Sequence, residues 1–248
     1  MRSDIVVTNL TKSFGEVTAV SSLDLDITQG EVFGLLGPNG AGKSTTISIL
    51  CGLIEPSSGS ASVGGEDVVE ASSKVKEAIG VCTQSASVLP HLTGMENVVL
   101  FGQLHGLSKK KAGEQAAALL RRMGLSADQG RRAGKYSEGM KKRLSLALAL
   151  VGDPRIVFLD EPTAAMDPQA RRAVWDVVRE LKQEGRTVVL TTHYIEEAEM
   201  LCDRVGIIDH GRLIALGAPA DLIEQNGKKD LEEVFIHLTG RSIREGAE

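Results

Sequence analysis

The sequence is poor in cysteine, and its three thiols give no motif. Cys51, Cys82 and Cys202 are far apart and odd in number, so neither a disulfide framework nor a metal or redox spacing is indicated. We therefore expect the cysteines to be small buried hydrophobic residues of a protein from a reducing compartment. Aromatic residues are also scarce, at 3% of the chain.

Long apolar runs are also missing. The best run, residues 144–152, is far shorter than the ~20 residues that a membrane-spanning helix needs. Asp4 and Asn9 interrupt the N-terminal segment, so we do not expect a signal peptide. These two absences predict a cytosolic protein, unless a partner holds it at a membrane.

The charge balance argues against a general nucleic-acid-binding protein, because the net charge is −5. The charge is unevenly distributed, however. Residues 105–145 contain eleven Lys and Arg against three Asp and Glu, which is about +8 for this stretch and about −13 for the remainder. Either the stretch is a solvated helical face, or it is attracted to an anionic membrane surface or an acidic partner.

One segment carries the strongest chemical signal. It fits the pattern G-x-x-x-x-G-K-[ST] of a phosphate-binding loop, followed by a threonine. An apolar run at 31–36 predicts a strand before it, and residues 44–51 suit a helix after it. Glycines bring backbone N–H groups close to an anion at the helix N-terminus, the lysine faces the β and γ phosphates, and the serine hydroxyl suits Mg²⁺. The segment consists of Gly37, Pro38, Asn39, Gly40, Ala41, Gly42, Lys43, Ser44 and Thr45.

The order of apolar patterns predicts an α/β fold. The first ~65 residues hold short β-like runs at 5–7, 19–20, 23–27 and 32–36, followed by a hairpin at 61–69 that turns at Gly64-Gly65. Residues 92–151 have helical character, with helices expected at 109–123 and 138–151. Strands at 156–159, 187–191, 205–209 and 213–216 then alternate with helices at 168–184 and 194–201. This alternation predicts a mainly parallel sheet with a helical insertion.

Two carboxylates follow a second buried strand. Residues 156–159 are apolar, and Asp160 and Glu161 come directly after them. Because ligands of open α/β sheets bind at the carboxyl ends of the strands, we expect both acids beside the phosphate loop. Asp160 is then suited to support Mg²⁺, directly or through water, and Glu161 to polarise a water that attacks the γ-phosphate.

The segment Tyr136-Ser137-Glu138-Gly139-Met140, followed by basic residues, lies shortly before this strand. With the two motifs above, it makes the chain resemble the ATP-binding cassette (ABC) family, whose signature is usually Leu-Ser-Gly-Gly-Gln. The resemblance runs from about residue 5 to 216. It implies that Ser137 and Gly139, at a helix N-terminus, form an anion site for the ATP on the other subunit's phosphate loop. Glu138 departs from the common glycine, and we expect its side chain to point outward.

Four further positions match the family. Gln84 corresponds to the glutamine that contacts Mg²⁺ and forms a hinge toward the membrane subunit, and His193 to the histidine that senses the γ-phosphate. Asp167 corresponds to the loop between the two ATP sites, although Ala165-Met166 replaces the usual Gly-Leu. Phe14 corresponds to the aromatic residue stacked on adenine, or else it belongs to the core.

The resemblance implies the organisation of the chain. A single domain, residues 1–248, would contain a core lobe (1–91 and 152–220) with an N-terminal antiparallel β-subdomain. The other parts would be a helical subdomain (92–151) and a C-terminal helical tail (221–248). The tail pattern at 231–241 is similar to that of ABC-2-type exporter ATPases, or it is a short amphipathic helix packed on the core.

The resemblance also implies an activity: hydrolysis of ATP with Mg²⁺ at a head-to-tail dimer interface. The dimer would be a homodimer, or a heterodimer with a second ABC ATPase. Glu161, His193 and Lys43 would be catalytic, and Ser44, Gln84 and Asp160 would hold the metal. A separate permease would place the protein on the inner face of the cell membrane, and the subfamily favours export. The alternatives are a non-transport ABC ATPase acting on nucleic acid or the ribosome, and a small-molecule kinase.

Overall fold

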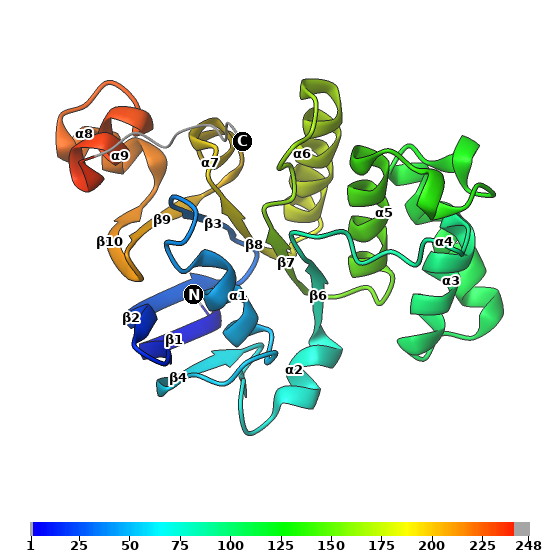
Figure 1. Cartoon of the computed structure of the whole chain (residues 1–248), viewed down its shortest axis with the longest axis horizontal. Helices are drawn as coiled ribbons and strands as arrows, with labels where there is room; N and C mark the ends of the chain where they lie inside the picture. Colours follow the sequence, from blue (N-terminus) through cyan, green and yellow to red (C-terminus); the bar gives the residue numbers. More distant parts are fainter. Residues whose placement is uncertain (1, 241–248) are drawn as a thin grey trace.

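A six-stranded sheet runs through the centre of the protein in the order β10-β9-β3-β8-β7-β6 (Figure 1). The computed structural model describes residues 2–240 of the chain. Neighbouring strands are parallel except for the pair β9 and β10, which is antiparallel. The predicted mainly parallel sheet is therefore confirmed. Its strands are β3 (Val32–Leu36), β6 (Ile79–Cys82), β7 (Ile156–Asp160), β8 (Thr187–Thr192), β9 (Arg204–Asp209) and β10 (Arg212–Gly217).

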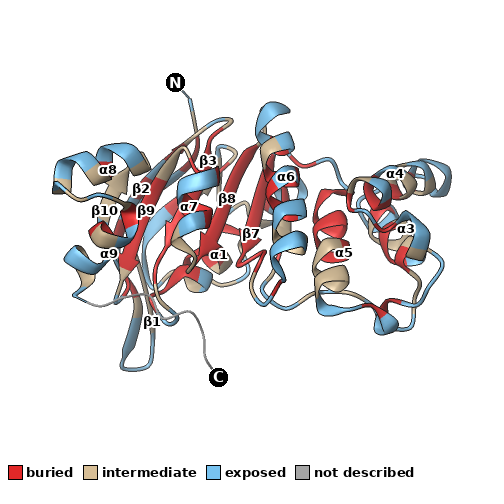
Figure 2. Ribbon diagram, turned by 90° about the horizontal axis from the view of Figure 1, so that it is seen from above, coloured by how far each residue is buried: buried red, intermediate tan, exposed pale blue. Residues whose placement is uncertain are grey.

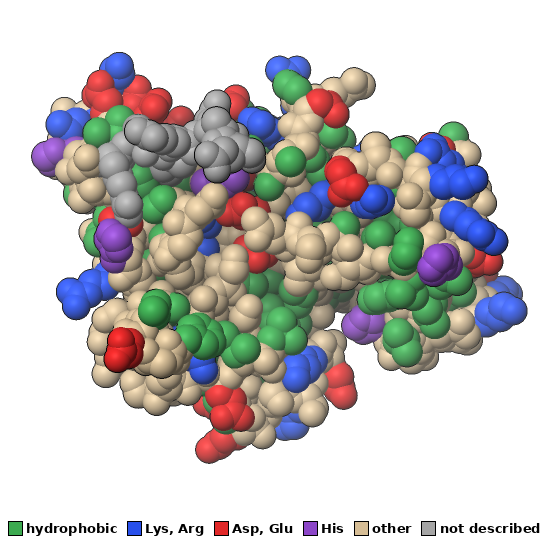
Figure 3. Space-filling view, in the orientation of Figure 1, with side chains coloured by type: hydrophobic (Ala, Val, Ile, Leu, Met, Phe, Trp, Pro, Cys, Tyr) green, Lys and Arg blue, Asp and Glu red, His purple; other side chains and the backbone are tan. Residues whose placement is uncertain are grey.

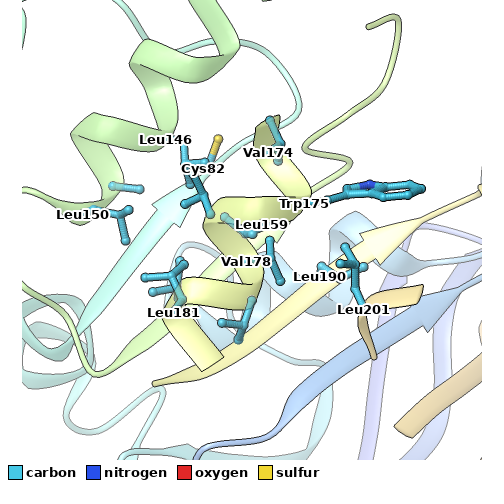
Figure 4. Packing of buried hydrophobic residues seen from close by; sticks show 14 of the residues in the cluster. Cys82, Leu146, Leu150, Leu159, Val174, Trp175, Val178, Leu181, Leu190 and Leu201 are labelled. Atoms are coloured by element: carbon cyan, nitrogen blue, oxygen red, sulfur yellow. The ribbon is translucent and has the colours of Figure 1, made fainter. Parts of the chain in front are cut away.

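Strands β3, β8 and β7 are buried along their whole length, which explains their largely apolar sequences (Figure 2). Successive residues serve opposite faces. Leu159 and Leu190 pack with the helices α5 (Glu138–Leu150), α6 (Pro168–Gln183) and α7 (Ile195–Leu201), as Figure 4 shows. Phe158 and Val189 pack instead with α1 (Lys43–Leu50) and the second sheet. Two cores thus hold the central sheet from both sides.

The second sheet is antiparallel, in the order β2-β1-β4-β5. Its strands are β1 (Ser3–Phe14), β2 (Val17–Thr28), β4 (Ser58–Val63) and β5 (Glu66–Asp67). The expected hairpin at Gly64-Gly65 is present between β4 and β5. The two short runs at 19–20 and 23–27 are one strand, however. It bends at Ser22, where φ is 47°, and its pairing with β1 shifts register nearby.

Three helices form one end of the molecule: α3 (Gly94–Leu104), α4 (Lys109–Arg122) and α5 (Figure 1). Each begins at a hydroxyl cap, because Thr93, Ser108 and Ser137 accept hydrogen bonds from backbone N–H groups of the first turn. The predicted helices 109–123 and 138–151 are confirmed to within a residue. Lys and Arg side chains are spread over this end (Figure 3). Treating residues 92–151 as a separate subdomain stays a prediction.

Three helices that the sequence did not delimit are α2 (Ser72–Ala78), α3 and α8 (Pro219–Asn226). In the C-terminal tail, α9 (Leu231–Thr239) packs on the core through Leu231, Val234 and Phe235, all fully buried. Residues 241–248 of the expected tail lie outside the described part of the chain.

All three cysteines are buried and free, as expected. Within residues 2–240 we find no helix with the length and apolar character needed to cross a bilayer.

Candidate active site

The phosphate loop lies between β3 and α1, as predicted, and two of its glycines are required by close backbone contacts. A Cβ atom on Gly42 would lie 2.3 Å from the carbonyl oxygen of Ala19, and φ at Gly42 is 104°. A Cβ on Gly37 would lie 2.4 Å from the carbonyl oxygen of Ile208. Strands β2 and β9 therefore hold the loop on both sides, in a conformation that only glycine permits at these positions.

Lys43 lies inside the loop, with only 4% of its surface exposed. Its Nζ donates to the carbonyl oxygens of Gly37 (2.7 Å) and Pro38 (3.0 Å), and lies 3.4 Å from Glu161 Oε1. Burial lowers the pKa of Lys43, and the carboxylate of Glu161 opposes that shift. The loop thus carries a buried cation at the N-terminus of α1, which suits an anionic ligand.

Asp160, at the end of β7, and Ser44, in the first turn of α1, bring two side-chain oxygen atoms together. The Ser44 hydroxyl donates to Asp160 Oδ1 at 3.1 Å, and the Thr191 hydroxyl donates to the same oxygen at 2.5 Å. No cluster of three or more His, Cys, Asp or Glu side chains suited to a metal occurs in residues 2–240. One carboxylate with a hydroxyl nevertheless fits Mg²⁺, which is usually held by one or two carboxylates, waters and substrate phosphates.

Three side chains from separate segments converge on Glu161. His193 Nδ1 lies 3.4 Å and Gln84 Nε2 lies 3.2 Å from Glu161 Oε2, while Lys43 faces the other carboxylate oxygen. Glu161 is 6% exposed and has φ of 47°, an uncommon value for a residue with a Cβ. The neighbouring imidazole of His193 and the Lys43 charge hold the pKa of Glu161 below its usual range, against burial. Glu161 is therefore a carboxylate at neutral pH.

Eight of the predicted site residues line one hollow of about 270 Å³. His193 contacts this group through Glu161, and Asp160 contacts it through Ser44. Sequence reasoning missed Thr191, which anchors both Asp160 and the backbone N–H of Glu161. Its only signal was a polar residue ending a strand next to β7. The lining residues are Ala19, Asn39, Gly40, Gly42, Lys43, Ser44, Thr45, Gln84 and Glu161.

The other predicted residues lie elsewhere. Ser137 caps α5 by accepting from the Met140 N–H at 3.3 Å, and Gly139 follows in the first turn. Asp167 caps α6 and borders a separate hollow of about 280 Å³ between α5 and α6. Glu138 is 77% exposed and pairs with Lys141, so its side chain points outward as expected.

Phe14 does not line the hollow at the phosphate loop. It ends β1 at the tip of the first hairpin and is 51% exposed, so the alternative that it belongs to the core is wrong. The ammonium of Lys12 lies 5.0 Å from its ring centroid. Its stacking on adenine stays a prediction.

The fold and this constellation are those of a P-loop ATPase with a signature helix, and comparison with known proteins identifies the family. Residues 20–164, more than half of the chain, match the family described as ABC transporter. The chain belongs to the ABC transporter family. It is an ATPase subunit of that family, and it binds ATP.

Several curated proteins are similar over nearly the whole chain. The daunorubicin/doxorubicin resistance ATP-binding protein DrrA of Streptomyces peucetius is 46% identical, over 92% of this chain and 69% of that protein. The linearmycin resistance ATP-binding protein LnrL of Bacillus subtilis strain 168 is 40% identical, over 96% and 75%. The Nod factor export ATP-binding protein I of Rhizobium sp. strain N33 is 43% identical, over 90% and 74%.

Solved structures agree on the fold. An ATP-binding subunit of an ABC transporter superposes with a TM-score of 0.86 at 29% identity, covering 95% of this chain and 99% of that one. A dimeric ATP-binding cassette in a post-hydrolysis state, bound to ADP and Pi, superposes with a TM-score of 0.80 at 26% identity, covering 86% and 98%. The predicted ABC ATPase fold is confirmed.

Proposed function

We propose that this subunit hydrolyses ATP between two copies that face each other head to tail, or between this chain and a second ABC ATPase. Each ATP would lie between the Lys43 loop of one copy and the Ser137–Gly139 end of α5 in the other. Within one chain the Ser137–Gly139 end of α5 does not line the hollow at the phosphate loop, so a single copy offers a triphosphate only the contacts of its own loop. The dimeric ADP- and Pi-bound relative supports this arrangement.

The convergence of Lys43, Gln84 and His193 on Glu161 is the observation that carries the proposed chemistry. Lys43 and the loop N–H groups bind the β and γ phosphates, whose oxygens compete with Glu161 for the ammonium. Glu161 then accepts the proton of the attacking water at its freed carboxylate oxygen. His193 orients that carboxylate and contacts the γ-phosphate.

Ser44 and Asp160 would hold Mg²⁺, with Gln84 at the edge of the hollow as a further oxygen ligand. When bound, Mg²⁺ would neutralise negative charge on the phosphates. The Thr191 hydroxyl orients Asp160, because it donates a hydrogen bond to Asp160 Oδ1. The same oxygen also accepts from the Ser44 hydroxyl. This donor set predicts that hydrolysis requires a divalent cation.

The ATPase would drive export through a separate membrane permease, and the protein would thus lie on the inner face of the cell membrane. The names of the relatives, resistance and export ATP-binding proteins, support export. A largely apolar hollow of about 290 Å³ between β6, α3 and α5 offers the permease a docking place, with Leu53 and Phe101 in its wall. The same names disfavour an ABC ATPase acting on nucleic acid or the ribosome, and no nucleic-acid partner is proposed.

Replacing Glu161 by Gln tests the proposal. The amide keeps the size of the side chain but cannot accept the proton, so we expect turnover to fall at least about 100-fold while ATP stays bound. Dimers should then accumulate with Mg-ATP, as measured by size-exclusion chromatography with light scattering. Glu138→Gln, on an exposed side chain, serves as the control. Normal hydrolysis by Glu161→Gln would refute the assignment of the base, and ATP trapped in monomers would refute the shared site.

A further inference from the structure

Lys142, in the second turn of α5, reaches across to the catalytic segment. Its Nζ donates to the backbone carbonyl oxygens of Thr83 at 3.3 Å, of Gln84, and of Glu161 at 3.5 Å. The first two belong to the loop after β6, and the third follows β7. One half-buried ammonium therefore joins α5 to the two segments that carry Gln84 and Glu161, both of which line the ATP hollow.

The three bonds have a clear physical effect. An ammonium is a three-donor cation, and bonds from a charged donor to carbonyl oxygens are roughly twice as strong as neutral ones. Lys142 thus sets the separation between the backbones of Gln84 and Glu161, whose side chains are themselves 3.2 Å apart. Without it, the loop at residues 83–87 would keep mainly its internal bonds, such as those of the Thr83 hydroxyl with Ser85 and Ser87.

The same face of α5 also contacts the apolar hollow between β6, α3 and α5. Ser145, one turn beyond Lys142, lies 3.6 Å from the Cys82 thiol at the end of β6. Ser145, Thr83 and Ser87 all line that hollow. Lys142 therefore lies between the proposed permease-docking hollow and the ATP hollow, on the helix that begins at Ser137.

We propose that Lys142 is a positioning residue that holds the Gln84 loop and the Glu161 backbone in register with α5. This inference rests on the proposed function of Glu161 and Gln84. Lys142 acts through these residues and does not touch the substrate. Its bonds make the position of α5 a determinant of the Gln84–Glu161 distance, so displacement of α5 alters the rate of the hydrolytic step more than ATP binding.

The test compares Lys142→Met with its neighbour Lys141→Met. Methionine keeps the apolar stem of lysine and removes all three donors, so we expect kcat to fall about tenfold, with KM for ATP changed less than about twofold. Lys142→Arg, which keeps charge and donors, should restore at least half of the activity. Lys141, on the same helix, pairs with the exposed Glu138, and its Met variant should hydrolyse ATP normally. Melting temperatures show whether each variant folds. If Lys142→Met does not fold, Lys142→Gln, which keeps two donors but not the charge, takes its place.

A double-mutant cycle with Gln84→Ala separates positioning from general weakening of the fold. If Lys142 acts through the Gln84 loop, its loss should cost at least threefold less in kcat when Gln84 is already Ala, because contacting residues are not additive. Full additivity would overturn the inference, and so would normal kcat in Lys142→Met. If Glu161→Gln remains active, the proposed function fails first. If Glu161→Gln is inactive and Lys142→Met is normal, only the positioning role fails.

Discussion

The ammonium of Lys43 and the carboxylate of Glu161 lie 3.4 Å apart, and both side chains are almost fully buried. Burial of either charge alone would be costly, so each stabilises the charged form of the other. Lys43 also bonds two carbonyl oxygens of its own loop. The pair joins the residue expected to bind phosphate to the residue expected to activate water.

Replacing Lys43 by Ala should therefore weaken ATP binding, as well as hydrolysis. Loss of a charge-assisted contact to phosphate is expected to reduce affinity at least about tenfold. Binding of a fluorescent ATP analogue measures this directly. Lys74→Ala, which removes a lysine from an exposed pair with Glu66, is the control and should bind normally. Unchanged affinity in Lys43→Ala would contradict the placement of the phosphates.

Replacing Glu138 by Gly should change the ATPase rate by less than about tenfold, which is 1.4 kcal/mol of barrier. The reason is that the Glu138 carboxylate is 77% exposed and already paired with Lys141, so solvent and the ammonium offset its charge. Steady-state ATPase assays check this. A rise above tenfold would mean that the carboxylate repels the γ-phosphate in the working dimer.

Glu197 should make stability depend on pH. Its Oε1 accepts bonds from Thr163 (2.9 Å) and Trp175 (3.0 Å), and it is fully buried, which raises its pKa. The folded protein then binds the Glu197 proton more tightly than the unfolded chain does. Its contribution is complete below the unfolded pKa of about 4.3 and is lost as pH rises through the folded value.

The wild type should consequently lose stability relative to Glu197→Gln as pH rises from about 4.3, because the amide does not titrate. Urea unfolding of both proteins across this pH range measures the difference in their free energies of unfolding. Contributions from the pKa shifts of other groups, including Glu161, are common to both proteins and cancel. Glu197→Ala should be less stable than either, since the donors of Thr163 and Trp175 lose their acceptor. Parallel pH profiles for wild type and Gln variant would show that Glu197 is ionised when folded.

Gly42 and Gly40 offer a matched pair within one loop. Both have positive φ, 104° and 79°, but an added Cβ meets the Ala19 carbonyl oxygen at 2.3 Å only at Gly42. We expect Gly42→Ala to destabilise the protein by roughly 2 kcal/mol more than Gly40→Ala, because backbone must move to relieve the contact. Thermal or urea unfolding measures the difference. Equal losses would mean that β2 does not hold the loop.

The sequence by itself determined the features that depend on local backbone chemistry. Glycine spacing defined the phosphate loop, the Ser108 cap located α4, an apolar stripe located α5, and apolar runs located β3, β7 and β8. The two carboxylates at the end of β7 could be placed beside the loop because parallel strands share one carboxyl edge. Family resemblance added His193 and Gln84, which the structure brings to Glu161.

Only the tertiary structure decided which side chains meet. Lys142 looked like one of several basic residues after the signature, and Glu197 like one of three acids in a short amphipathic helix. Their partners are 58, 34 and 22 residues away along the chain, at Gln84, Thr163 and Trp175. The separation of Ser137 from the Lys43 hollow likewise follows from how α5 packs on the sheet. Such contacts depend on packing between distant segments, and no local pattern encodes that geometry.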